Sequence, residues 1–504
     1  MKRVDTVGMM TQNETEEALP ANLKKNFALS TAYQILILVS PFITAPYVSR
    51  VLGADGIGIY SYTRTIQMYF SLFAALGTSA YGAREIARSR DNIEERSRLF
   101  WEIELLSMAT SALCIVAWFV FIFCMAVNYK FFFIIFTLNI LATMLDISWF
   151  YTGLEQFKYT VTINSVFRIL GIVAQFIFIK ERSDLWIYVA IMVLSNFLGT
   201  FSMWIPLRTF LVSVSLKKLR ILPHIKETLV YFVPAIATSL YTLLDKILIG
   251  VITKQPEQNG YYEQASQLVN AGKAFAFASL NQVIGIRISY LFKKEKYDEI
   301  KNRIKLSTQY ILFMGVGTAF GIAACADTFV PWFFGRDYAG AIPVLKMMIP
   351  LVVVIGISGC LGSQYYTPAG LRGQSAVFIV AGAALNIILS VIFIPMFKAV
   401  GAVIGTFSSE LVIAVLYVAF SRGYLTFDGI LKYGWRNMMS GVVMFAIVYL
   451  LNFWNVNECL RLPVQIVVGG VIYVLLLFLL CDEFVLLGKK RLLCKRCEKR
   501  GFND

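Results

Sequence analysis

Charged residues and histidine are both scarce in this chain of 504 residues. Only 15% of the residues are charged, whereas a soluble domain carries about 25%. His224 is the single histidine, which excludes metal sites built from several histidines and most histidine general-base schemes. No GxxxxGK[ST] sequence is present, so this chain does not encode a nucleotide-driven pump. These absences exclude a water-soluble globule and several classes of enzyme.

Cysteine provides no disulfide framework. The eight cysteines are scattered, and most of them lie in apolar stretches. Cys494 and Cys497 form a CxxC pair near the C-terminus, but a metal site of this kind normally needs a second ligand pair. We therefore interpret these two residues as reduced thiols and expect neither a metal site nor a cofactor.

Apolar sequence, in contrast, is abundant. Hydrophobic residues make up 58% of the chain, and the mean hydropathy is +0.67. A helix needs about 20 mainly apolar residues to cross the hydrocarbon core of a bilayer. The stretches that meet this need are 27–48, 57–80, 101–126, 131–152, 161–180, 185–207, 229–251, 263–288, 306–326, 344–366, 375–396, 400–421, 437–455 and 464–481. The sequence thus predicts an all-α integral membrane protein with about fourteen transmembrane helices.

The positions of Lys and Arg predict the orientation of these helices. With the N-terminus in the cytoplasm, the loops on the cytoplasmic side hold 31 of the 46 Lys and Arg residues, and the outer loops hold 7. Short cytoplasmic loops normally carry this excess. We therefore expect both termini in the cytoplasm. The net charge of +15 is then a topological signal, and no nucleic-acid partner is expected.

A loose internal repeat predicts two lobes. Arg50-Val-Leu-Gly53 followed by Gly58-Ile-Tyr60 recurs as Ile247-Leu-Ile-Gly250 followed by Gly260-Tyr-Tyr262. Each copy joins the first two helices of a six-helix block, as in folds with parallel repeats. The predicted parts are a cytoplasmic segment (1–25), an N-lobe (26–211), a basic cytoplasmic linker (212–228), a C-lobe (229–421), two further spans (422–481) and a basic cytoplasmic tail (482–504).

Several longer strings occur in a familiar order and spacing. They include Leu23-Lys-Lys-Asn26, Ser49-Arg-Val-Leu-Gly53, Tyr81-Gly-Ala-Arg84-Glu85, Asp146-Ile-Ser-Trp149-Phe150-Tyr151, Asp245-Lys246-Ile-Leu-Ile-Gly250 and Phe334-Gly335-Arg336-Asp337-Tyr338. Together they resemble the polysaccharide transporter family of oligosaccharide flippases, within the multidrug, oligosaccharidyl-lipid and polysaccharide exporter superfamily. The resemblance extends from about residue 23 to about residue 421.

This resemblance implies a fold and a function. Members of the superfamily fold as two six-helix lobes around a central cavity. The Wzx-type branch moves polyprenyl-diphosphate-linked oligosaccharides, the repeat units of O-antigen, capsule and other surface glycans, from the cytoplasmic to the outer leaflet of the bacterial inner membrane. Alternating access coupled to H⁺ or Na⁺ is implied as well. The expected partners are the lipid-linked glycan, membrane lipids and proteins of polysaccharide assembly.

Two cations in the middle of predicted spans are the candidate substrate ligands. A charge at this depth costs at least ~2.5–3.5 kcal/mol on insertion scales, so it normally serves a function. Arg64 shares a polar helix face with Tyr60 and Gln67, and Lys273 lies beside a face containing Glu263, Gln267 and Asn270. If the two faces meet across the lobes, their cations suit a diphosphate. Alternatively, Arg64 and Lys273 pair with acids such as Glu263 and hold the bundle together.

Two other basic residues are expected outside this cavity. Lys246 lies nearer a helix end, where a lysine can extend to the membrane interface. Arg168 lies in the fifth span, peripheral to a cavity between lobes, where it could pair with a helix carbonyl or an acid.

The acidic residues of the spans supply candidates for ion coupling. Asp245, in the first span of the second lobe, is the preferred candidate, and Glu263 is a second one. Asp146, Trp149 and Glu155 lie near the cytoplasmic end of the fourth span. An aromatic belt explains this position, and the resemblance adds a structural or gating role.

Prolines occur in the helices with which the two predicted lobes begin. Pro41 and Pro234 lie in the first span of each predicted lobe, and a proline inside a helix frees a carbonyl and bends the helix. Such bends could serve alternating access, or they could be static kinks that packing tolerates.

Two alternatives to a flippase remain open. One is a small-molecule or multidrug antiporter, although a cavity lined by cations does not suit cationic drugs. The other is a membrane glycan polymerase or acyltransferase. The longest expected outer segment is only 327–343, which is short for a glycan polymerase. The single histidine also disfavours this enzyme class.

Overall fold

The computed structural model describes residues 21–124, 128–215, 219–454 and 456–486, and its regular structure there is entirely helical. The helices are α1 (Ala21–Ala75), α2 (Thr78–Arg88), α3 (Ile93–Cys124), α4 (Lys130–Met144), α5 (Ser148–Gly153), α6 (Phe157–Phe178), η1 (Arg182–Asp184), α7 (Leu185–Ser202), η2 (Pro206–Thr209), α8 (Leu222–Thr253), α9 (Pro256–Lys293), α10 (Tyr297–Phe334), η4 (Arg336–Tyr338), α11 (Ala341–Met348), α12 (Leu351–Leu361), η5 (Gly362–Tyr366), α13 (Arg372–Phe397), α14 (Ala399–Ala419), α15 (Phe427–Leu450), η6 (Leu451–Phe453) and α16 (Glu458–Leu479). Cys494 and Cys497 lie outside the described residues.

Eleven helical segments of the described chain are long and apolar enough to cross a membrane. The first of them, Thr31–Arg88, contains two predicted spans, and the eleven do not include α8 and α9, which cover the predicted spans 229–251 and 263–288. The all-α membrane architecture is therefore confirmed, while the total of fourteen spans stays a prediction. The predicted linker 212–228 is partly helical, because α8 begins at Leu222.

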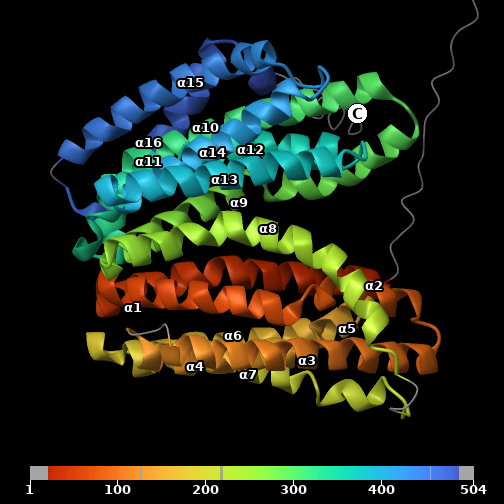
Figure 1. The fold of residues 1–504 in the computed structure, drawn as a ribbon. Helices are drawn as coiled ribbons and strands as arrows, with labels where there is room; N and C mark the ends of the chain where they lie inside the picture. Colours follow the sequence, from red (N-terminus) through yellow and green to blue (C-terminus); the bar gives the residue numbers. More distant parts are fainter. Residues whose placement is uncertain (1–20, 125–127, 216–218, 455, 487–504) are drawn as a thin grey trace, which may run out of the picture.

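Figure 1 shows the helices as roughly parallel rods in two groups. The N-terminal half (α1–α7) forms the lower group, and the C-terminal half (α9–α14) forms most of the upper group. The last long helices, α15 and α16, pack against α10. Helix α8 lies between the halves and contacts α1 and α2 on one side and α9 and α13 on the other. It is therefore placed to connect movements of the two halves.

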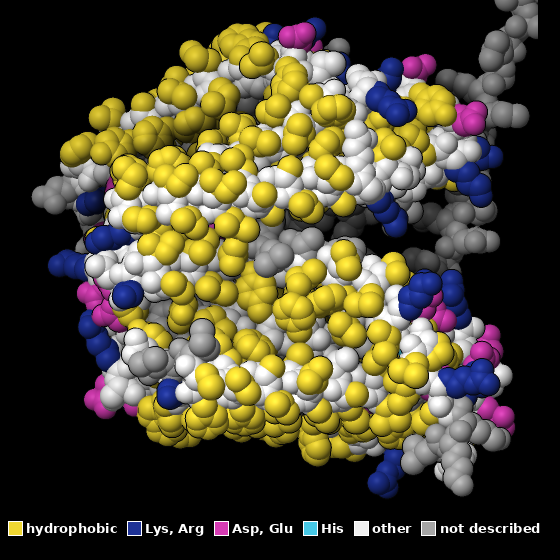
Figure 2. Space-filling model, in the orientation of Figure 1, with side chains coloured by type: hydrophobic (Ala, Val, Ile, Leu, Met, Phe, Trp, Pro, Cys, Tyr) yellow, Lys and Arg dark blue, Asp and Glu magenta, His cyan; other side chains and the backbone are white. Residues whose placement is uncertain are grey.

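Apolar side chains cover the flanks of the molecule, and charged side chains gather at its two ends (Figure 2). On α3, for example, Leu113 is 72% exposed and Phe123 is 68% exposed. Exposed apolar side chains at this density are expected where lipid surrounds a helix. The long axes of the helices therefore lie along the direction in which the chain would cross a bilayer.

The break in α1 is at a glycine. Gly53 has φ 69° and ψ 177°, a conformation that glycine adopts without steric cost. The two arms of α1 on either side of Gly53 correspond to the first two predicted spans. Pro41 lies within the first arm, which remains helical around it, so the main break in this element is at Gly53. Pro234 lies on α8, and its side chain is outside the described ones.

Backbone groups of the two halves approach closely beside this break. A Cβ atom on Gly58 of α1 would lie 1.7 Å from the carbonyl oxygen of Pro256 at the start of α9. Likewise, a Cβ atom on Gly260 of α9 would lie 2.2 Å from the carbonyl oxygen of Ala54. Only glycine fits at either position. We call this region of contact the closed end.

Polar contacts add to the closed end. The hydroxyl of Tyr338 donates a hydrogen bond to the carbonyl of Gly53 at 3.0 Å. Arg182 forms an ion pair with Asp337 at 2.6 Å, and both side chains are more than half exposed. At the opposite end of the molecule, Figure 2 shows a dark hollow between the halves. The structure is thus closed at one end and open at the other.

The glycine contact makes the closed end sensitive to a single methyl group. We expect Gly58→Ala to weaken the closure by about 1–3 kcal/mol, because the added Cβ overlaps a backbone carbonyl that has no free rotation. The measurement is the rate of thiol labelling of Ala54→Cys in detergent, followed by mass spectrometry of that site, since Ala54 is 6% exposed and its backbone forms part of the contact. Labelling should become roughly tenfold faster.

Gly373→Ala is the matched control, because a Cβ there would meet nothing within 4 Å. Equal labelling rates in the two alanine variants would contradict the role assigned to Gly58.

Candidate functional site

A cavity of about 500 Å³ lies mainly within the N-terminal half. We call it the main cavity. Both arms of α1 line it, together with α4, α6 and α7, and α9 of the C-terminal half supplies Glu263, Gln264 and Gln267. The residues Tyr60, Arg64 and Gln67 of the predicted polar face also line it. Their spacing explains this, because a rotation of 100° per residue keeps them within about 60° of one another on the helix.

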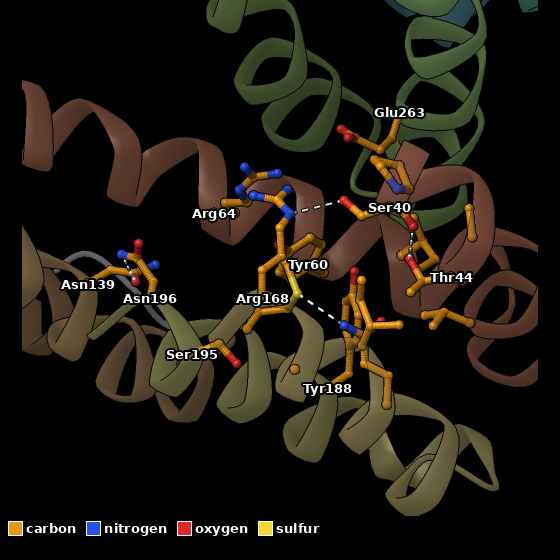
Figure 3. Close-up of a pocket in the computed structure, with 18 of the residues that line it drawn as sticks. Ser40, Thr44, Tyr60, Arg64, Asn139, Arg168, Tyr188, Ser195, Asn196 and Glu263 are labelled. Carbon is orange, nitrogen blue, oxygen red and sulfur yellow. Dashed lines mark hydrogen bonds between the residues drawn. The ribbon is translucent and has the colours of Figure 1, made fainter. Parts of the chain in front are cut away.

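Two arginines reach this cavity from different elements. Arg64 belongs to the second arm of α1, where its guanidinium carbon lies 5.7 Å from the centre of the Tyr60 ring. Arg168 comes from α6 and donates a hydrogen bond from Nε to the hydroxyl of Ser40 at 3.0 Å. In Figure 3 both guanidinium groups extend into the same region of the cavity. Among the described residues neither arginine forms an ion pair within 4 Å.

Arg168 was not among the residues predicted to line the cavity. Helical periodicity did carry a signal, because the spacing of Asn164, Arg168 and Gln175 places them within about 40° of one another on α6, and all three line the cavity. The structure shows that α6 packs against α1, and this packing brings Arg168 to Ser40. The cavity therefore holds two cations, and the second one is Arg168.

The predicted pairing of Arg64 with Lys273 in one cavity is wrong. Lys273 lines a different, smaller cavity of about 260 Å³, together with Phe277, Ile311 and Ile355. The reason is the geometry of α9. Lys273 lies ten residues beyond Glu263, which places it roughly 15 Å further along the helix and about 80° around it.

Asn270 does not line the main cavity either. It shares the helix face of Glu263 but lies roughly 10 Å further along α9, where its side chain is exposed. Of the residues predicted on α9, Glu263 and Gln267 therefore reach the cavity, while Asn270 and Lys273 do not.

The carboxylate in the cavity wall is already paired. Glu263 lies 2.6 Å from the Nζ atom of Lys246, whose side chain is only 16% exposed. It also accepts a hydrogen bond from the hydroxyl of Ser61 at 2.6 Å and one from Gln267 at 3.4 Å. The expectation that Lys246 extends to the membrane interface is thus wrong. Glu263 pairs with this lysine of α8 instead of with Arg64 or Lys273.

A chain of uncharged polar side chains covers another part of the wall. Asn196 of α7 donates to Asn139 of α4 at 3.1 Å, and Asn139 donates to Gln67 at 3.4 Å. Gln67 in turn donates to Ser71 at 2.6 Å, which also accepts from Thr143 at 2.9 Å. This amide chain, as we call it, joins three helices. Of its amides only Gln67 was predicted, although amides within apolar spans were a usable signal.

Asp245 lies in the C-terminal half, outside the cavity. Its carboxylate is 2% exposed and accepts hydrogen bonds from the hydroxyls of Tyr262 at 2.7 Å, Ser390 at 3.3 Å and Thr406. The amide of Asn386 faces the same carboxylate. Helix α8 carries this acid, and three other helices (α9, α13 and α14) surround it with polar side chains, a set that suits H⁺ or Na⁺.

Asp146, Trp149 and Glu155 form local contacts at the open end. Asp146 accepts a hydrogen bond from the backbone N–H of Ser148 at 2.9 Å, and Trp149 is 3% exposed. Glu155 forms an ion pair with Arg90 at 2.8 Å. The hydrogen bond from Arg90 holds the pKa of the Glu155 carboxyl below its ordinary value. None of the three predicted residues lines the main cavity.

The comparisons with known proteins agree with this architecture. Residues 23–285 match the model of the family described as polysaccharide biosynthesis protein. The chain belongs to this family. A protein of Escherichia coli K12 named "Putative O-antigen transporter" is 23% identical over 412 residues, which cover 80% of this chain and 97% of that protein. The family membership confirms the resemblance drawn from the sequence strings.

Other relatives and solved structures extend the comparison. The "Probable low-salt glycan biosynthesis flippase Agl15" of Haloferax volcanii is 25% identical over 276 residues, or 52% of this chain and 56% of that protein. The lipid II flippase MurJ in an inward closed conformation has a TM-score of 0.72 at 16% identity, covering 92% of this chain and all of that one. An inward-facing multidrug transporter of the MATE family has a TM-score of 0.60 at 12% identity, covering 84% and 98%. The predicted fold is therefore confirmed.

The buried pair between Lys246 and Glu263 provides a test of the site. We expect Lys246→Met to destabilise this family member by about 3–5 kcal/mol, because it leaves a carboxylate buried without its cation. The double variant Lys246→Met/Glu263→Gln should recover most of that loss. The free energies come from thermal or denaturant unfolding of the purified protein in detergent. A double variant no more stable than Lys246→Met would contradict the pairing.

Proposed function

We propose that this protein is a flippase for a polyprenyl-diphosphate-linked oligosaccharide, the repeat unit of a surface polysaccharide. In this proposal it moves the glycan from the cytoplasmic to the outer leaflet of the bacterial cytoplasmic membrane. The membership in the polysaccharide biosynthesis family supports it, as do relatives whose names describe an O-antigen transporter and a glycan biosynthesis flippase. The superfamily fold is shared with a lipid II flippase.

The observation that carries the proposal is the pair of arginines in the main cavity. Arg64 and Arg168 form no ion pair within 4 Å among the described residues, and the cavity's Glu263 is paired with Lys246 instead. A guanidinium offers a planar fork of donors that matches the oxygens of a phosphate. A diphosphate therefore suits this cavity, the amide chain suits the hydroxyls of a glycan, and the polyprenyl tail can stay in the lipid.

The two ends of the molecule support alternating access. Lys and Arg are concentrated in the segments expected in the cytoplasm. One of these segments, 82–100, carries five of them. It begins in α2, beside the open end. The open end then faces the cytoplasm, where the glycan is assembled. Export needs the closed end to part while the open end closes.

A multidrug antiporter is the second candidate, because a transporter of that class has the same fold. Its support is weaker. A cavity with two unpaired arginines repels the organic cations that such transporters commonly carry. The paired carboxylate of Glu263 offers those cations no free anion.

Transport of a fluorescent polyprenyl-diphosphate disaccharide in proteoliposomes tests the proposed function. We expect Arg64→Ala and Arg168→Ala each to slow its flipping about tenfold or more, since a hydrogen bond to a charged group contributes about 1.5–3 kcal/mol. Lys273→Ala should flip at nearly the wild-type rate, because Lys273 lies in another cavity. Lipid-linked glycan that stays on its original leaflet with the wild-type protein would sink the proposal.

We further propose that Asp245 binds the coupling ion, H⁺ or Na⁺. Asp245→Asn removes the titratable, charged group but keeps its size, so flipping should no longer accelerate when a pH or Na⁺ gradient is imposed. The wild-type protein should accelerate several-fold with one of the two gradients. Asp428→Asn, an exposed aspartate at the start of α15, is the control and should respond as the wild type does. An Asp245→Asn protein that still responds would exclude Asp245.

A further inference from the structure

The charges of the main cavity set a limit on the charge of its ligand. Among the described residues that line it, the ionisable acids and bases with full charge are Arg64, Arg168 and Glu263. Lys246 compensates Glu263 at 2.6 Å. The cavity therefore has an excess of two positive charges. A diphosphate joined to a lipid on one side and a sugar on the other carries two negative charges, so it matches this excess.

The rest of the polar wall is uncharged. Seven of the lining residues are Asn or Gln, and an amide side chain can both donate and accept hydrogen bonds. The amide chain fixes part of this wall through bonds between Asn196, Asn139 and Gln67. Hydroxyl and acetamido groups of sugars have the same mixture of donors and acceptors. A wall that is held in place by its own bonds favours such groups without rearrangement.

Gln264 provides an independent indication of the ligand's chemistry. Its side chain is 2% exposed, lines the cavity and donates a hydrogen bond to the hydroxyl of Ser49 at 2.9 Å. Its carbonyl oxygen has no partner among the described residues. A buried acceptor without a donor is costly, so a ligand that brings an O–H or N–H group is favoured here. A carboxylate, which brings only acceptors, is disfavoured.

We propose that the main cavity selects glycans whose sugars beside the diphosphate are uncharged. This inference rests on the proposed function and adds to it the class of substrate. An acidic sugar in that position would add a third negative charge without a matching cation and would face the acceptor of Gln264. A neutral or acetamido sugar meets the amide wall with both donors and acceptors.

The experiment compares two synthetic lipids in the same proteoliposomes. One is a polyprenyl diphosphate that carries a disaccharide of two glucose units, and the other has glucuronic acid in place of the glucose that is attached to the diphosphate. We expect the wild-type protein to flip the neutral lipid at least tenfold faster than the acidic one. Equal rates for the two lipids would overturn the inference but leave the flippase intact. Movement of neither lipid would instead contradict the proposed function.

A charge added to the wall should reverse the preference. Asn196 is exposed to the cavity, so Asn196→Lys can supply the missing cation without burying it. We expect this variant to flip the acidic lipid at least several-fold faster than the wild type does. Asn457→Lys is the matched control, since Asn457 is exposed at the start of α16 and makes no side-chain cap there.

The control should leave the ratio of the two rates at its wild-type value. An Asn196→Lys protein with an unchanged ratio would count against selection by charge. The comparison of the two lipids in the wild type stands without any variant, so a variant that fails to fold does not remove the test.

Discussion

The buried ion pair between Lys246 and Glu263 is the interaction on which the site depends. It joins α8 to α9, and the hydrogen bond from Ser61 extends it to α1. Isolated charges are costly in a membrane protein, but a pair with additional hydrogen bonds is tolerated. Because Glu263 is neutralised in this way, Arg64 and Arg168 keep their positive charge available to a ligand. The same pair therefore holds the halves together and defines the electrostatics of the cavity.

The closed end shows how closely the backbones of the two halves can meet. At Gly58 and Gly260 the backbones are too close for any Cβ atom, so small residues permit direct contact of helices, as they do in membrane bundles. The exposed ion pair of Arg182 and Asp337 contributes little by comparison. The closed end is held by backbone packing, and the other end is hollow. This arrangement suits a molecule whose two ends must open and close.

The sequence predicted the parts of this structure that follow from periodicity and hydropathy. The polar face of Arg64 and Gln67 lines the cavity because helical spacing alone places them together. The predictions failed where the outcome depends on how each helix is rotated about its axis and how far it is shifted along that axis. It paired Arg64 with Lys273, which lies too far along α9, and it left Arg168 outside. It also misjudged Lys246, because nothing in the local sequence reveals that Glu263, seventeen positions further on, lies within bonding distance.

By itself, the sequence determined that this chain is a helical membrane protein of the polysaccharide biosynthesis family. Apolar length and the order of short strings carry that information, and neither depends on how the helices pack. Only the tertiary structure decided which charges meet. In a bundle of long helices, a contact depends on the rotation and the axial position of both partners, and a shift of a few residues moves a side chain into another cavity. The meeting of Arg168 with Arg64 in one cavity, the pairing of Glu263 with Lys246 and the assembly of the amide chain from three helices were therefore visible only after the helices were packed.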